Sequence, residues 1–155
     1  MIHILVDSAA DFSKKEIEEK GIHLVPLQVS FQEEQYLDGV NLERDEFYEK
    51  LVHGKAFPKT SQPSPQEFLD VFEEVKEKGD EIICILLSSA LSGTYQSAQL
   101  ARSMADYDKI YIVDSLSAVV AIRMLCDTAL DMAEHGHSAQ EIVEELEELK
   151  GKIQI

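Results

Sequence analysis

Short apolar runs and amphipathic stretches alternate along the chain. The apolar runs, rich in isoleucine and valine, cover residues 2–6, 23–29, 81–87 and 110–114. Continuous runs of this kind are typical of parallel strands that are covered on both faces. Stretches with a helical period cover residues 14–20, 44–53, 65–78, 93–105, 119–135 and 139–150. This order predicts an α/β fold, in which an open, doubly wound and mostly parallel sheet carries helices on both faces.

Three of the helical stretches begin with a serine that is followed three residues later by a glutamate. In such a capping box, the two side chains satisfy each other's free backbone amides at the start of a helix. The pairs are Ser13 with Glu16, Ser64 with Glu67, and Ser138 with Glu141. A structural role therefore accounts for these three serines.

Two runs rich in small polar residues lie near the predicted strands, "KTSQPSP" at 59–65 and "SSALSGTYQS" at 88–97. The first is expected to be a loop stiffened by its two prolines. The second follows a predicted strand at the carboxyl edge, where open α/β sheets bind their ligands, and it opens the next helix. The residues that the capping boxes leave unexplained are Thr60, Ser61, Ser88, Ser89, Ser92, Gly93 and Thr94. An N-cap role explains Ser89 or Ser92 alone, but the whole cluster indicates a site for a phosphate or a carboxylate.

Two further strand ends carry an aspartate followed by a serine, Asp7-Ser8 and Asp114-Ser115. Because the carboxyl ends of parallel strands meet at one edge, these segments are expected to converge on the same crevice. Beside an anion site, the two carboxylates are better suited to anchoring loops by accepting backbone amides than to touching the ligand.

Composition and charge exclude several classes of function. The 155 residues suit one domain, and 45% of them are hydrophobic, which is enough for a core. The net charge of −16, from 30 acidic and 14 basic residues, argues against nucleic acid or an anionic membrane as partner. The sequence contains no G-x-S-x-G, no phosphate-loop motif and no G-x-G-x-x-G, and its five histidines have no visible catalytic or metal-binding partners. No catalytic residue, metal or cofactor is therefore expected.

The two cysteines, Cys84 and Cys126, lie in apolar surroundings and are expected to be small buried hydrophobic residues. The chain opens directly on a strand-like segment, and no apolar run approaches about 18 residues. These features predict a reduced cytoplasmic protein without integral membrane association.

The polar motifs resemble those of one known family. "VDSAAD", "KTSQPSP", "LSSALSGTYQSA" and "VDSLSA" follow one another in the order and approximate spacing of the DegV family, and the resemblance covers the whole chain. This family includes the fatty-acid-binding subunits of bacterial fatty acid kinase. The resemblance implies that residues 1–155 form the amino-terminal α/β domain of the family. It also implies that the second, carboxyl-terminal α/β domain, which holds the fatty acid from the other side, is absent from this chain.

The resemblance also implies roles for individual residues. Thr60 and Ser92 match the positions that hold the fatty-acid carboxylate, with Ser61 and the amide of Gly93 close by. The chain would then be a carrier without catalysis of its own, which presents the acyl chain to a separate ATP-dependent fatty acid kinase. Where the family usually has a serine and two glycines after the last Asp-Ser motif, this chain has Val119, Ala121 and Arg123. These bulkier residues are expected to narrow or redirect the channel for the acyl tail.

Two other functions fit the same pattern. An enzyme transferring phosphoryl or acyl groups would use Ser92 or Thr60 at the anion site, although no candidate base accompanies them. A protein-interaction module would use an apolar face of the domain to dock a partner.

Overall fold

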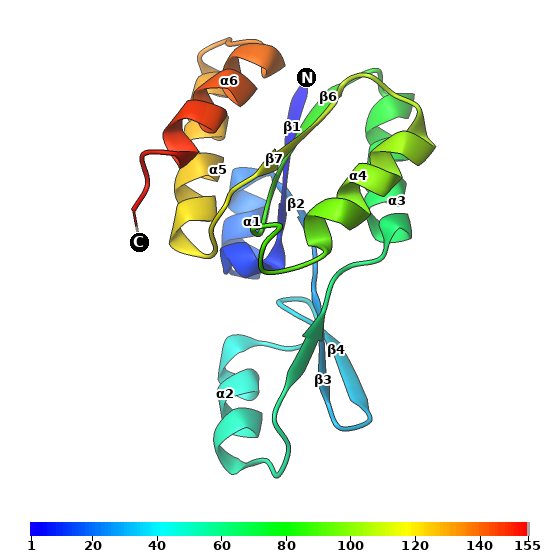
Figure 1. The fold of residues 1–155 in the computed structure, drawn as a ribbon, viewed down its shortest axis with the longest axis vertical. Coiled ribbons are helices and arrows are strands. Elements are labelled where there is room, and N and C mark those ends of the chain that lie inside the picture. The colour runs from blue at the N-terminus through cyan, green and yellow to red at the C-terminus, as the bar shows by residue number, and fades with distance from the viewer. Residues whose placement is uncertain (155) are drawn as a thin grey trace.

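The computed structural model describes residues 1–154 and shows a larger and a smaller lobe that meet at one end of the larger lobe (Figure 1). The larger lobe holds a parallel sheet of strand order β2-β1-β6-β7. Its strands are β1 (Ile2–Asp7), β2 (His23–Val25), β6 (Glu81–Leu86) and β7 (Ile110–Asp114). Its helices are the 3₁₀ turn η1 (Ser8–Ala10), α1 (Lys14–Lys20), α3 (Pro65–Glu77), α4 (Thr94–Ala105), α5 (Val120–Glu134) and α6 (Ala139–Lys150). The predicted α/β fold is confirmed.

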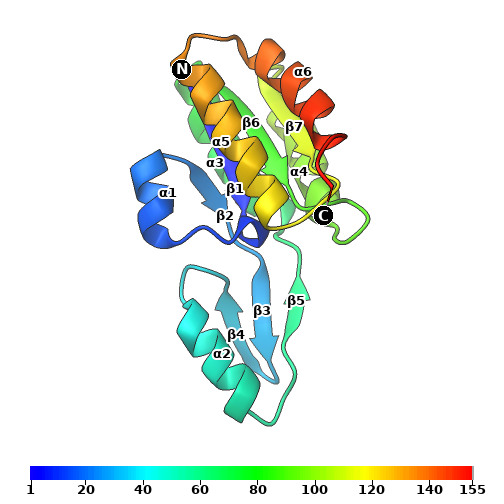
Figure 2. The same ribbon diagram turned by 90° about the vertical axis from the view of Figure 1, so that its left-hand side faces the viewer.

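Helices cover both faces of this sheet, and successive strand residues point to opposite faces, so both sets of side chains are buried. One face packs against α1, α5 and α6, and its buried side chains include Ile4, Val6, Ile83, Ile85, Leu125 and Leu146. The other packs against α3 and α4, and its buried side chains include Leu5, Cys84, Leu86, Phe68, Phe72 and Ala101. Figure 2 shows α5 in front of the sheet and α3 behind it. With both faces covered, the loops at the carboxyl ends of the strands are the open part of the sheet.

The smaller lobe has its own sheet and its own small core. It consists of β3 (Gln28–Phe31), β4 (Glu34–Leu37), α2 (Arg44–His53) and β5 (Lys59–Ser61), with an antiparallel sheet of order β4-β3-β5. Val29, Phe31 and Leu42 are buried together, and Tyr36 and Phe47 pack against them. This cluster is separate from the two cores of the larger lobe. The lobes are therefore two bodies that the chain joins by two links, before β3 and after β5.

Two predictions about residues 23–61 were wrong. The single strand expected at 23–29 is divided between the two sheets, because β2 ends at Val25 and β3 begins at Gln28. Between them, Pro26 has no amide to donate to a ladder, and the amide of Leu27 donates to Oγ of Ser8 at 2.9 Å. The "KTSQPSP" run is also not a loop throughout, since its first three residues form β5 and pair with β3.

The three capping boxes form at the starts of α1, α3 and α6. Ser13 and Ser138 each accept a hydrogen bond from the glutamate amide at 3.2 Å. At α3, the carboxylate of Glu67 instead accepts from both the amide and the hydroxyl of Ser64, at 2.7 and 3.0 Å. Ser64 is therefore part of the α3 start, as expected from the sequence.

A partly buried histidine pair, His3 and His23, lies near the amino ends of β1 and β2, away from the loops at the carboxyl ends of the strands. Nδ1 of His3 lies 3.1 Å from Nε2 of His23, and Nε2 of His3 lies 2.9 Å from a carboxylate oxygen of Asp80. Burial, followed by the charge of His3, lowers the pKa of His23 below its usual value. The unfolded chain therefore takes up a proton at this residue at a pH where the folded chain does not.

Acidification is accordingly expected to destabilise the fold through His23. The sign follows from the lowered pKa: the contribution of His23 to stability is present above its unfolded value of 6.5 and is lost as the pH falls below it. Urea unfolding at pH 7.5 and pH 5.5 should show a smaller acid-induced loss of stability in His23→Gln than in the parent. Equal losses in the two proteins would show that His23 does not contribute to the pH dependence.

Candidate functional site

The two polar runs meet where the smaller lobe touches the start of α4. A Cβ placed on Gly93 would lie 2.7 Å from Nε2 and 3.0 Å from Oε1 of Gln62, so the amide end of Gln62 lies directly against Gly93. The φ of Gly93 is −76°, which any residue adopts, so the glycine is required here for close approach and not for its backbone angle. The segment that carries Thr60 is thereby brought beside the segment that carries Ser92.

The start of α4 offers a hydroxyl and backbone amides, of which Ser92 caps that of Thr94. Gly93, not Ser92, is the N-cap residue of α4, and it makes no side-chain cap hydrogen bond. Oγ of Ser92 lies 2.9 Å from Oγ1 of Thr94 and accepts from the Thr94 amide at 3.3 Å. Thr94 is fully buried, whereas Ser92 and Gly93 are partly exposed. Ser92 is therefore held in place by Thr94 while its hydroxyl remains at the surface beside the positive end of the helix.

Three of the candidate serines are buried and bonded within the protein. Oγ of Ser8 accepts from the Leu27 amide, Oγ of Ser88 accepts from the Ala90 amide at 3.3 Å, and Oγ of Ser115 donates to the carbonyl of Ser117 at 3.0 Å. These bonds shape the loops at the carboxyl edge. Ser8, Ser88 and Ser115 thus support the site from inside.

Asp7 and Asp114 anchor loops through backbone amides, the structural role that the sequence indicated. The two carboxylate oxygens of Asp7 accept separately from Ala9 at 2.8 Å and from Leu87 at 2.7 Å. In Asp114, one oxygen accepts from both Ser89 and Leu116, each at 3.1 Å. These bonds tie the loops after β1 and β7 to the strands they follow, and they join the loop after β6 to the ends of β1 and β7.

The two carboxyls differ in their electrostatics. Burial raises the pKa of Asp7 to about 6 and outweighs the amide bonds from Leu87 and Ala9, which lower it. Burial also raises the pKa of Asp114, but its hydrogen bonds to Ser89 and Leu116 outweigh that effect and leave the pKa below its usual value. Asp114 is only partly buried, so the loss of water around its ionised carboxylate has a smaller energetic cost than in Asp7.

The accessible candidates are fewer than the sequence suggested. Thr60 and Ser61 are exposed on β5, and Ser89, Ser92 and Gly93 are partly exposed. Successive residues of a strand point to opposite faces, so Thr60 and Ser61 cannot both face the start of α4. The arrangement therefore offers a small set of hydroxyl and amide donors, suited to an anion and lacking a base.

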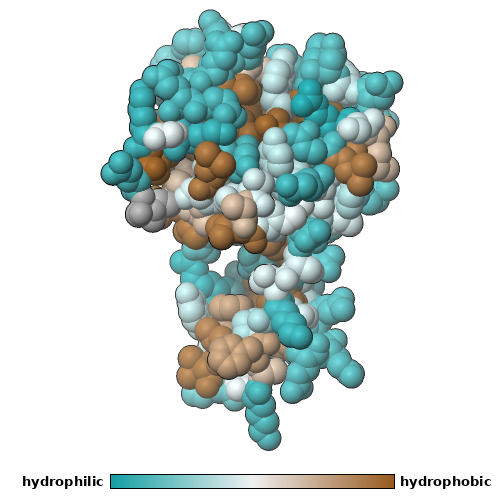
Figure 3. Space-filling model, in the orientation of Figure 1, coloured by the Kyte–Doolittle hydropathy of each residue, from teal (hydrophilic) through white to brown (hydrophobic). Residues whose placement is uncertain are grey.

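Exposed apolar side chains surround these donors. Figure 3 shows hydrophobic atoms along the lower edge of the larger lobe, over the loops after β6 and β7 and the start of α5. The exposed apolar residues of this edge are Leu91, Leu116, Val119, Val120 and Met124. A polar head group held at Ser92 would thus have apolar surface beside it.

The residues that depart from the family pattern lie at the start of α5. Val119 has a φ of +50°, an unusual angle for a β-branched residue, and its amide donates to the carbonyl of Ala9 at 3.0 Å. Ala121 is buried. The guanidinium of Arg123 lies 4.4 Å from the ring centre of Phe12, so this side chain packs toward α1. Its effect on an acyl tail stays a prediction.

Other kinds of site find no support in residues 1–154. No group of three or more histidine, cysteine, aspartate or glutamate side chains in that range is placed to hold a metal ion. Within the same range, none of the helices combines the length and the apolar character needed to cross a bilayer. Cys84 and Cys126 are buried and free, and burial raises the pKa of both thiols, to about 12 for Cys126. Two surface hollows, of about 450 and 580 Å³, are lined by other residues than the candidates.

Gln62 is the residue of this site that sequence reasoning missed. It lies within the "KTSQPSP" run, but the sequence pattern pointed to the hydroxyl groups of this run and not to the side-chain amide. The signal that points to Gln62 is the glycine opposite it, which only the fold brings near.

Comparison with known proteins gives a consistent result. A family model described as "Uncharacterised protein, DegV family" matches residues 1–155. A DegV domain-containing protein from Caldanaerobacter subterraneus is 42% identical over 142 residues, which are 92% of this chain and 50% of that protein. Protein DegV from Bacillus subtilis is 38% identical over 150 residues, 96% of this chain and 53% of its own length. The chain thus spans about half the length of the curated relatives it matches.

Solved structures with the same fold are described as fatty-acid-binding proteins. The crystal structure of a stearic acid-binding protein from Eubacterium ventriosum matches with a TM-score of 0.88 and 39% identity, over 95% of this chain and 52% of that one. DegV from Bacillus subtilis, described as a fatty acid binding protein, matches with a TM-score of 0.88 and 37% identity, over 97% and 54%. A Thermus thermophilus protein of the same family, also described by its fatty acid binding, gives 0.86 and 34% over 96% and 53%.

Proposed function

This chain belongs to the DegV family, and we propose that it binds a long-chain fatty acid whose carboxylate is held by Thr60 and Ser92. The observation that carries the proposal is the contact of Gln62, the residue after β5, with Gly93 at the start of α4. The description of similar structures as fatty-acid-binding proteins supports the same ligand class.

The donors suit a carboxylate. A hydroxyl from each lobe and the amide end of α4 provide hydrogen bonds to an anion, and the helix dipole favours negative charge there. Ser61, Ser89 and Thr94 would support these groups from nearby. Since binding forms no covalent bond, it needs neither a base nor a nucleophile.

Head and tail contribute differently to binding. Burial of each methylene group is worth about 0.8 kcal/mol, so ten or more together exceed the roughly 1.5–3 kcal/mol of a hydrogen bond to a charged group. The tail would set the affinity, and Thr60 and Ser92 would set the orientation of the head group.

The resemblance to the family motivates a proposal for the wider role. The chain would be a non-catalytic, cytoplasmic carrier that presents the acyl chain to a separate fatty acid kinase. Residues 1–155 would form the amino-terminal domain, and the fatty acid would lie between it and a second domain.

Titration of the chain with decanoate, followed by NMR of the backbone amides, tests the proposal. Shifts are expected at Thr60, Ser92 and Gly93, and decanol, with the same tail but no charge, should produce much weaker ones. A decanoate titration that leaves these amides unmoved would contradict the site.

Thr60→Val is expected to weaken decanoate binding about tenfold, the lower end of the range for a hydrogen bond to a charged group, because the site is open to water. Valine keeps the shape of threonine and suits a strand, so the melting temperature should stay the same. The dissociation constant from the NMR titration measures the effect.

Ser64→Ala is the matched control, four residues away. It should cost about 1 kcal/mol of stability through the lost contact with Glu67, without changing the affinity. If Ser64→Ala lowered the affinity as much as Thr60→Val, the assignment of Thr60 to the ligand would be wrong.

A further inference from the structure

The two hydroxyls assigned to the ligand stand on different lobes. Thr60 belongs to β5, which pairs only with β3 of the smaller lobe, whereas Ser92 precedes α4 of the larger lobe. Among residues 1–154, the buried cluster of the smaller lobe is separate from the two cores of the larger lobe. The distance between Thr60 and Ser92 therefore depends on how the smaller lobe is held.

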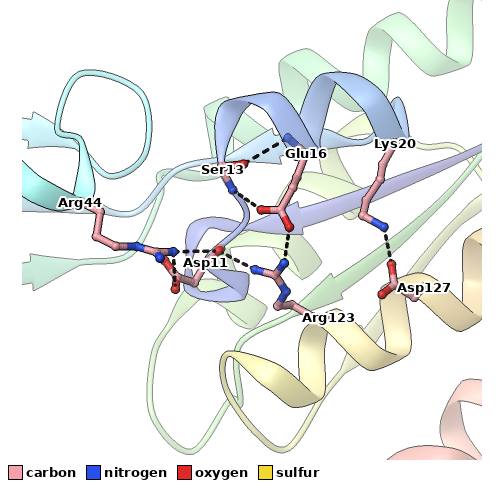
Figure 4. Close-up of polar contacts among 7 residues, drawn as sticks. All are labelled: Asp11, Ser13, Glu16, Lys20, Arg44, Arg123 and Asp127. Atoms are coloured by element: carbon pink, nitrogen blue, oxygen red, sulfur yellow. Dashed lines mark hydrogen bonds and ion pairs between the residues drawn. The ribbon is translucent and has the colours of Figure 1, made fainter.

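Asp11 lies at the junction of the lobes and binds two arginines (Figure 4). Its carboxylate accepts from Nη2 of Arg44, on α2 of the smaller lobe, at 2.8 Å. Its carbonyl accepts from Nη1 of Arg123, on α5, at 2.8 Å. The other nitrogen of Arg123 donates to Glu16 of α1. Asp11 is thereby fixed to the larger lobe by its main chain, while its side chain reaches the smaller lobe.

A second ion pair runs beside the first. Nζ of Lys14, the first residue of α1, lies 2.8 Å from the carboxylate of Glu43, the N-cap residue of α2. Both pairs join the start of α2 to the segment between η1 and α1. Besides the two chain links, Gln62 packs on Gly93 across the junction, and the carboxyl of Asp38 in the smaller lobe lies beside the hydroxyl of Ser8 in the larger one.

We propose that the Asp11–Arg44 pair is a positioning clasp, which holds the smaller lobe so that Thr60 and Ser92 can bind one carboxylate together. The inference rests on the proposed function, and Arg44 and Asp11 act through Thr60 without touching the ligand. A ligand that needs both hydroxyls binds only the arrangement in which they are close, so its apparent affinity falls with the population of that arrangement.

The expected effect is modest. The side chains of Arg44 and Asp11 are 61% and 55% exposed, and exposed ion pairs change an equilibrium by about twofold to fivefold. Such pairs are also screened by salt, so part of the affinity for a fatty acid should be lost at high ionic strength.

Arg44→Gln and Asp11→Asn test the clasp. Asparagine tolerates the φ of +58° at position 11, and it keeps the carbonyl that Arg123 binds. The matched control is Lys20→Gln, which removes the 2.7 Å pair between Lys20 and Asp127, because that pair joins α1 to α5 within the larger lobe (Figure 4).

Two measurements on the 155-residue chain separate positioning from simple stability. The first is the dissociation constant for decanoate at low and high sodium chloride. The second is the distance distribution between spin labels at Glu49→Cys on α2 and Glu145→Cys on α6, since the native cysteines are buried and stay unlabelled.

Arg44→Gln and Asp11→Asn are each expected to weaken decanoate binding twofold to fivefold, to reduce its salt dependence and to broaden the distance distribution. The double variant should do no more than either single change, because both remove the same bond. Lys20→Gln should change neither measurement. The clasp would be overturned if Arg44→Gln and Asp11→Asn left the decanoate affinity or the spin-label distances unchanged. It would also be overturned if their effects were equal to those of Lys20→Gln. If the parent chain bound no decanoate, the proposed function would fall, and the distance distributions would still decide whether the clasp exists.

Discussion

Asp7→Asn is expected to destabilise the fold by about 2 kcal/mol at pH 7, whereas Asp114→Asn should cost clearly less. The two oxygens of Asp7 accept from two different amides, of Ala9 and Leu87, in a fully buried position. An asparagine has only one acceptor oxygen, so its NH₂ group must face one of those amides, donor against donor. Relief of the buried charge offsets part of this cost, since burial raises the pKa of Asp7 to about 6.

Asp114→Asn is the matched control for Asp7→Asn. It also binds two amides, but both bonds go to the same oxygen, so an asparagine can keep them. Urea unfolding of the parent and the two variants at pH 7 gives the difference. Equal stabilities of Asp7→Asn and Asp114→Asn would show that the two-oxygen arrangement of Asp7 contributes nothing specific.

The larger lobe could be predicted because its signals are local. Strands buried on both faces leave continuous apolar runs, and serine-glutamate pairs mark three of the helix starts. Each α-helix of this lobe was predicted to within one residue at either end, whereas the 3₁₀ turn η1 was not predicted. The anchoring role of Asp7 and Asp114 followed from the same logic, since an aspartate directly after a parallel strand lies beside free amides.

Apart from α2, which the sequence predicted at 44–53, the smaller lobe could not be predicted for a physical reason. Its strands are only three or four residues long, and its core cluster contains three buried side chains, too few to produce a clear period. Its first strand also continues the apolar run of β2, so only the missing amide of Pro26 marks the break. The contact between Gln62 and Gly93 depends on the position of this lobe, so it could not be predicted from the sequence either.

The candidate site was therefore predicted as a set of residue types and not as an arrangement. Sequence alone brought eleven residues toward one edge, but it could not separate the buried hydroxyls of Ser8, Ser88 and Ser115 from the accessible ones of Thr60 and Ser92. That separation depends on which hydroxyls the loop amides and carbonyls use, and the loops are set by contacts distant in sequence. The sequence motifs thus indicated an anion site, and the burial of the side chains shows which of the hydroxyls are accessible to a ligand.

The affinity of the 155-residue chain for saturated fatty acids is expected to rise only about twofold per methylene group. Complete burial is worth about 0.8 kcal/mol per methylene, or roughly fourfold in affinity. Here Thr60 is exposed, and the apolar residues beside the proposed site, such as Leu91 and Val120, are 69% and 61% exposed, so this chain would provide one wall for the tail. A single wall removes about half of the tail surface from water and should give about half of the free energy.

Isothermal titration with octanoate, decanoate and dodecanoate measures the gain in affinity per methylene group. Bacillus subtilis DegV, which is about twice as long, serves as the comparison, and its gain is expected to approach fourfold per methylene group. From eight to twelve carbons, the affinity of this chain should rise about sixteenfold, against roughly 250-fold for full burial. Self-association across the exposed apolar edge would supply a second wall, so sedimentation must show a monomer at the concentrations used. A fourfold increment in a demonstrated monomer, or submicromolar binding of dodecanoate, would place the whole tail site within this chain and remove the need for a second domain.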